Sequence, residues 1–185
     1  LDQILQAFCE YLQTAREFED NGRLEEALLH HVFGLDLILG GESSVPLKNT
    51  LATRIAILAN TPMKSDFQEV VAFIGDTYDL RSSYVHRGEK GKLDQAKPKM
   101  SIADRLKRLS EISKIVLAAG IHSRKQKWCI GSDARNKWVA QIDLAVATRN
   151  AGKELSQNDI DQLGLDRISL QSGDLVPNIR ISWKT

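Results

Sequence analysis

The sequence predicts an all-α protein: an antiparallel helical bundle of about five helices followed by a small mixed C-terminal appendage. Apolar side chains recur every three or four residues through most of residues 1–120, which is the period of an amphipathic helix. Aromatic residues make up only 6% of the chain, so the core falls mostly to Leu, Ile, Val and Ala. Such a core favours helices packed on helices.

Three helices are expected in the first 62 residues, each ended by a helix-breaking pair. Their apolar stripes cover residues 2–20, 24–40 and 47–61. The breaks are Asn21-Gly22, Gly40-Gly41 and Thr61-Pro62. Glycine and proline disfavour a continuing helix, and short connections of this kind place successive helices antiparallel.

Two longer helices are expected to follow. The fourth begins at a cap provided by Ser65 or Asp66 and ends at Gly88, which suits the left-handed conformation of a helix terminator. The fifth begins at Ser101, the first residue of a weak capping box, and ends near Gly120. A Lys-rich loop separates the two helices.

The pattern of apolar residues after residue 122 differs from that of the preceding helices. We therefore assign residues 1–122 to the helical bundle and residues 123–185 to an extension of unknown role, which either packs on the bundle or forms a small module of its own. Within the extension, two helices and two short strands are expected, at residues 134–150, 156–163, 168–170 and 179–183.

Arg81 and His86 stand near the end of the fourth helix, separated by four residues. Arginine is a permanent cation with a donor fork suited to phosphate, and histidine gives or takes a proton near neutral pH. The pair suits cleavage of a phosphodiester without a metal ion. It is the strongest chemical signal in the chain.

The spacing of this pair is unfavourable within one helix. Five residues of an ideal helix turn through about 500°, so the two side chains would point roughly 140° apart. They can converge if His86 lies where the backbone leaves helical geometry, or if two copies of the helix meet. A structural alternative stays open, in which Arg81 forms an ion pair and His86 caps the last carbonyls. The candidate carboxylates are Asp36, Asp79 and Glu69.

Two separated segments read Leu-Ala-Thr-Arg-Ile-Ala-Ile-Leu at residues 51–58 and Tyr-Asp-Leu-Arg-Ser-Ser-Tyr-Val-His-Arg-Gly at residues 78–88. Together they resemble the HEPN superfamily, and within it the Apea-like branch. The resemblance covers about residues 4–120. It implies a helical bundle that forms a homodimer through the motif-bearing helix. In many members it also implies a metal-independent endoribonuclease of phage defence or toxin systems.

Under this resemblance Arg81 and His86 are the catalytic residues. Ser82 follows the arginine where active members often carry Asn or Asp, and Asp36 stands where relatives usually carry Glu. The residues expected to support the pair are Ser82, Asp36, Tyr84 and Arg87. Because some HEPN domains are inactive, the alternative is a silent dimerisation, regulatory or nucleotide-binding module of a larger defence protein.

The formal net charge of +1 excludes a strongly basic coat, so any affinity for RNA must come from a local patch. Lysines gather directly after the motif, in a stretch whose ordinary interpretation is a solvated loop. Its position beside His86 leads us to predict that it binds RNA phosphates. The lysines concerned are Lys90, Lys92, Lys97 and Lys99.

Other features exclude several classes of protein. Cys9 and Cys129 are too few and too far apart for a disulfide scaffold, which favours a reducing cytoplasm. No apolar run approaches the roughly 20 residues of a membrane span, so no membrane partner is expected. His30 and His31 are adjacent and face different ways on a helix, and we expect no metal or cofactor. Since Leu1 is not Met, we allow for a further, amino-terminal domain of the same protein as a partner.

Overall fold

The computed structural model describes residues 1–40, 47–87, 100–165 and 168, with residues 86 and 87 as backbone only. All regular secondary structure in these residues is α-helical, which confirms the all-α prediction. The helices are α1 (Asp2–Asp20), α2 (Leu24–Leu39), α3 (Leu47–Met63), α4 (Phe67–Arg87), α5 (Ile102–Arg124), α6 (Ala134–Asn150) and α7 (Gln157–Leu163). Both expected strands lie outside these residues, apart from Ile168, which belongs to no regular element.

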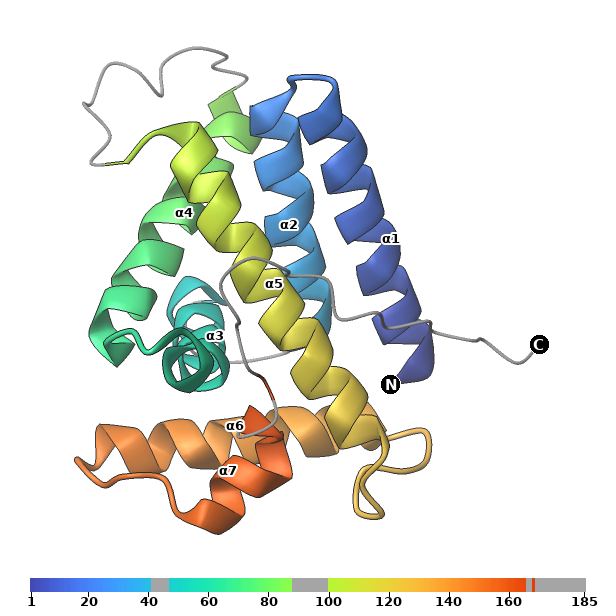
Figure 1. Cartoon of the computed structure of the whole chain (residues 1–185), viewed down its shortest axis with the longest axis vertical. Helices are drawn as coiled ribbons and strands as arrows, with labels where there is room; N and C mark the ends of the chain where they lie inside the picture. The colour runs from blue at the N-terminus through green and yellow to red at the C-terminus, as the bar shows by residue number, and fades with distance from the viewer. Residues whose placement is uncertain (41–46, 88–99, 166–167, 169–185) are drawn as a thin grey trace.

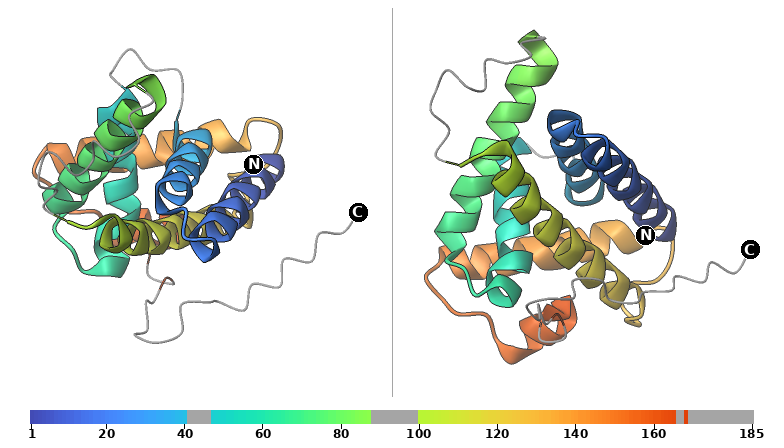
Figure 2. Two further views of the ribbon diagram at one scale, coloured as in Figure 1. Left: turned by 90° about the horizontal axis from the view of Figure 1, so that it is seen from above. Right: turned by 45° about the horizontal axis from the view of Figure 1, so that its top comes forward.

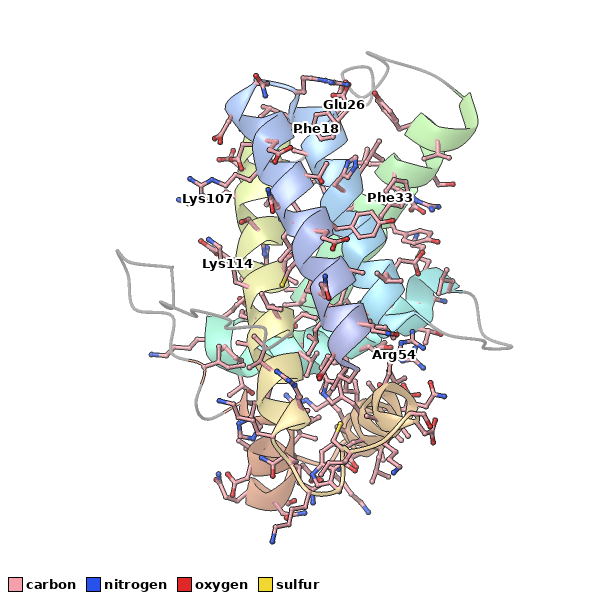
Figure 3. All side chains as sticks on the ribbon, turned by 90° about the vertical axis from the view of Figure 1, so that its right-hand side faces the viewer. Phe18, Glu26, Phe33, Arg54, Lys107 and Lys114 are labelled. Carbon is pink, nitrogen blue, oxygen red and sulfur yellow. The ribbon has the colours of Figure 1, made fainter. Side chains whose placement is uncertain are left out.

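The helices do not share one axis direction. α1 and α2 form an antiparallel pair, and α5 runs obliquely beside them (Figure 1). α3 is seen nearly end-on in Figure 1 and crosses the molecule in Figure 3, so it runs across α1 and α2. α6 lies across one end of these helices. The finer prediction of a five-helix antiparallel bundle is therefore not confirmed.

Local capping explains where several helices begin. Asp66 Oδ1 accepts hydrogen bonds from the backbone N–H groups of Gln68 (2.8 Å) and Glu69 (3.1 Å), so Asp66 is the one of the two predicted residues that caps α4. Ser101 caps α5 by accepting a hydrogen bond from the backbone N–H of Asp104 (3.1 Å). These caps satisfy amide groups that have no partner within the helix.

The predicted end of the fifth helix was wrong. α5 continues past Gly120 to Arg124. A Cβ atom on Gly120 would lie 2.8 Å from Cδ2 of Leu5 and 3.4 Å from the Trp138 ring. The glycine therefore allows α1 and α6 to approach α5 closely, a role that depends on tertiary contacts and leaves the helix intact.

The extension shares the core of the preceding helices. Trp138 and Ile142 of α6 are fully buried in the same cluster as Phe8 of α1, Ile38 of α2 and Ile57 of α3. An ion pair joins the two parts of the chain, because Arg54 Nε on α3 lies 2.7 Å from Asp143 Oδ1 on α6. α6 is thus packed directly on the helices that precede it.

The second half of α4 is less buried than its first half. Its buried side chains are Phe67, Val70, Phe73, Ile74 and Thr77, all in the first half. Between Tyr78 and Val85 no side chain is buried, and Val85 is 46% exposed. Figure 2 shows this end of α4 projecting beyond the neighbouring helices. The motif therefore lies on a half-helix that the other described helices cover only in part.

Candidate functional site

Arg81 is held between aromatic rings. Its guanidinium carbon lies 5.0 Å from the ring centroid of Phe33 on α2 and 5.4 Å from that of Tyr78, one turn earlier on α4. Figure 3 shows Phe33 on the side of α2 nearest α4. A cation over an aromatic face gains roughly 0.5–2 kcal/mol. These contacts orient Arg81 without neutralising its charge.

The carboxylates proposed as ion-pair partners of Arg81 are engaged elsewhere or too distant. Asp79 pairs with Lys48 (2.5 Å), and Glu69 pairs with Arg108 (2.8 Å). Asp36 forms no ion pair with Arg81 within the described structure. Burial raises the pKa of the Asp36 carboxyl, and the positive charge of Arg81 partly opposes this rise. Arg81 thus acts on Asp36 electrostatically, without an ion pair.

Arg81 keeps unused hydrogen-bonding capacity. Its Nε is buried and has no hydrogen-bond partner in the part of the chain that the structure describes. An unpaired buried donor costs about 1–3 kcal/mol. Ser82 follows Arg81 on α4 and is partly exposed.

Tyr84 and Arg81 meet at a small pocket between α2, α4 and the start of α5. Its volume is about 10 Å³, close to the space of one water molecule. The other lining residues are Glu25, Leu28, Leu29, Leu80 and Ile102. A nucleotide cannot enter this pocket, so an RNA site would have to lie on the surface above it.

The histidine of the motif belongs to the last turn of α4, which extends through Arg87. The side chains of His86 and Arg87 lie outside the described residues, as do Lys90, Lys92, Lys97 and Lys99. Because α4 is helical through His86, ideal geometry still directs Arg81 and His86 roughly 140° apart. The backbone of α4 therefore does not favour convergence of these two side chains within one chain.

Sequence reasoning did not identify the aromatic neighbours of Arg81. Phe33 is the last member of a strip of rings on α1 and α2, with centroid separations of 4.8 Å for Phe18–His30, 6.2 Å for His30–Phe33 and 6.5 Å for Tyr11–Phe33. The three-residue spacing of Tyr78 and Arg81 places both on one face of α4. That spacing was the only local signal, since Phe33 comes from another helix.

Comparisons with protein-family models, curated proteins and solved structures find no match to this chain. Among the described residues, no group of three or more His, Cys, Asp or Glu side chains is placed to hold a metal ion. None of the described helices combines the length and apolar character needed to cross a membrane.

Proposed function

We propose that the protein is a metal-independent endoribonuclease of the HEPN type, acting as a homodimer in phage defence or as a toxin. The observation that supports this most is the state of Arg81. Its guanidinium is stacked on Phe33 and Tyr78, yet it forms no ion pair or hydrogen bond with any described residue. An oriented cation without a counter-ion suits a phosphate ligand.

In the proposed reaction the ribose 2′-oxygen attacks phosphorus and the bond from phosphorus to the 5′-oxygen breaks. One group takes the 2′-hydroxyl proton, another protonates the leaving oxygen, and a cation stabilises charge on the phosphoryl oxygens. One His86 cannot readily do both proton transfers in a single step. Two copies of the chain supply two histidines and two arginines around one cleft.

The burial pattern of α4 supports assembly through this helix. The half-helix from Tyr78 to Val85 has no buried side chain, and Val85 exposes an apolar surface. A two-fold contact between these half-helices would cover that surface and bring both motifs to the axis. The lysines after His86 would then steer RNA toward the cleft.

The test is incubation of the pure protein with mixed RNA in EDTA. We expect cleavage products that end in a 2′,3′-cyclic phosphate, and a loss of about 10²-fold or more in Arg81→Ala and in His86→Ala. Arg16→Ala, which removes an exposed arginine of α1, is the matched control and should cleave normally. Equal activity in the motif variants, or abolition by EDTA, would reject the proposed mechanism.

A silent dimerisation or nucleotide-binding module is the second candidate. The stacking of Arg81 on two rings favours it, because such contacts can be purely structural. In that case the wild-type protein would not cleave RNA, and Arg81→Ala would lower the free energy of unfolding. Measuring unfolding by urea on the same variants separates this candidate from the enzyme.

A further inference from the structure

A second cationic region lies where the end of α2 meets α3 and α6. An open pocket of about 530 Å³ is present there, within the size range of small-molecule sites. Its lining residues are Gly40, Arg54, Arg135, Asn136, Val139, Ala140 and Asp143. Figure 3 shows Arg54 at the end of the helices that meets α6, whereas Phe33 lies farther toward the opposite end. The pocket is therefore separate from the surroundings of Arg81.

Arg54 is fully engaged with protein groups. Its Nε and Nη2 donate to the two carboxylate oxygens of Asp143 (2.7 and 2.8 Å), and its Nη1 donates to the Leu39 carbonyl (2.5 Å). The Arg54 side chain is only 8% exposed. Asp143 is thus used to balance a buried arginine, as a buried charge requires.

Arg135 donates only to backbone carbonyls among the described residues. Its Nε donates to the Ile38 carbonyl (3.3 Å), and its Nη2 donates to the carbonyls of Leu37 (3.3 Å) and Gly40. No carboxylate lies within ion-pair distance of Arg135 in the described ranges of the chain, and its Nη1 has no hydrogen-bond partner there. Burial, followed by repulsion from Arg54, lowers the pKa of the Arg135 guanidinium.

Among the described residues, the pocket is therefore lined by two guanidinium groups and one carboxylate. Asn136, in the first turn of α6, also lines the pocket; its side chain is exposed and forms no hydrogen bond with the described residues. An amide donor beside an unbalanced guanidinium matches the oxygens of a phosphate or carboxylate group, and charge-assisted hydrogen bonds are the stronger kind.

We propose that this pocket binds a small oxyanion, with Arg135 Nη1 and the Asn136 amide as its hydrogen-bond donors. The ligand is a small molecule bearing a phosphate or carboxylate group, and the site is independent of RNA cleavage at α4. If Arg135 served only to cap the carbonyls of α2, the pocket would show no preference for anions.

The experiment follows the side-chain amide and guanidinium NMR signals of the full chain, labelled with ¹⁵N, at constant ionic strength. Inorganic phosphate and acetate are titrated separately, so the two arms distinguish phosphate from carboxylate binding. Asn136→Asp places a carboxylate in the pocket at an exposed position. Asn150→Asp makes the same charge change on α6, about 21 Å away along the helix at 1.5 Å per residue.

We expect saturable shifts of the Asn136 and Arg135 signals with at least one anion. Asn136→Asp should weaken that binding by about 10-fold or more, whereas Asn150→Asp should change it less than about two-fold. Asp143→Asn frees the charge of Arg54 and should strengthen binding, a direction that a purely structural role does not predict. Linear shifts without saturation, or equal binding in Asn136→Asp and the wild type, would overturn the proposal.

Discussion

The surroundings of Arg81 and of His31 give these two side chains different properties. Phe33 stacks on the Arg81 guanidinium, whose Nε has no hydrogen-bond partner among the described residues. His31, two residues earlier, is 5% exposed, and its Nδ1 lies 3.0 Å from the hydroxyl oxygen of Ser113 on α5. Burial, with smaller contributions from Lys114 and His30, lowers the pKa of His31 to about 4. His31 is therefore a neutral part of the core at neutral pH.

The buried histidine predicts a loss of stability in mild acid. Its folded pKa of about 4 lies below the ordinary value of 6.5, so the unfolded chain binds more protons between these pH values. The contribution is fully present above pH 6.5 and is lost as pH falls toward 4, by about 3 kcal/mol at most. Urea unfolding at several pH values measures it.

The matched variants are His31→Gln and His30→Gln, which remove adjacent histidines. His31→Gln should flatten the dependence of unfolding free energy on pH between 4 and 6.5, since glutamine does not titrate. His30 supplies only a minor part of the lowering of the His31 pKa, so its replacement should change the slope much less than His31→Gln does. An identical slope in wild type and His31→Gln would show that His31 is not the responsible group.

At the scale of single elements, sequence signals were informative where the cause is local. Asp66 and Ser101 cap the helices that follow them, because a cap bonds amide groups two or three residues away. Gly120 misled the prediction because its neighbours Leu5 and Trp138 are distant in sequence. The contact of Arg81 with Phe33 could not be predicted from the sequence for the same reason. A pattern along one helix does not reveal which residue of another helix lies opposite.

Helix glycines with different neighbours predict opposite effects of the same substitution. A Cβ on Gly34 of α2 would lie 2.8 Å from the fully buried ring of Phe8 on α1. Gly34→Ala should therefore destabilise the protein by about 1–3 kcal/mol through overpacking. Gly75 of α4 faces only the flexible end of Lys48 at 3.3 Å.

Gly75→Ala is the control and should be neutral or stabilising by up to about 1 kcal/mol, because alanine is the better helix former. Urea unfolding of both variants gives the comparison. A Gly34→Ala protein as stable as Gly75→Ala would mean that α1 and α2 pack less closely than the structure indicates.

The loop after α4 carries a separate prediction, made from the sequence alone. Replacing its four lysines by Gln should weaken RNA binding and reduce the salt slope by roughly one unit for each phosphate that the variant no longer binds. These residues are Lys90, Lys92, Lys97 and Lys99. Four exposed lysines elsewhere provide a control with the same charge change: Lys107, Lys125, Lys127 and Lys153. An equal salt slope in both fourfold variants would mean that the four lysines after α4 do not bind RNA phosphates.

At the scale of the whole molecule, the two cationic regions differ in how they are built. The pocket at Arg135 is assembled by α6 packing on the end of α2, a contact between residues 95 or more apart in sequence. The surface at Arg81 lies on a half-helix that α2 and the start of α5 cover only in part. The described lining of the first region comes from one chain, whereas we propose that the second requires a second copy. Dimerisation and RNA cleavage should therefore be lost together.

The most direct test of this coupling combines sedimentation and RNA cleavage on the same samples of Val85→Glu. Leu144→Glu is the matched control, since Leu144 is an exposed leucine of α6 (57%) and Val85 is an exposed valine of α4 (46%). We predict that Val85→Glu is monomeric at tens of micromolar, keeps its helical content and cleaves RNA about 10²-fold more slowly, comparable to loss of a catalytic group. Leu144→Glu should remain a dimer with full activity. A monomeric Val85→Glu that cleaves at the wild-type rate, or a wild-type protein that is itself monomeric, would contradict the composite site.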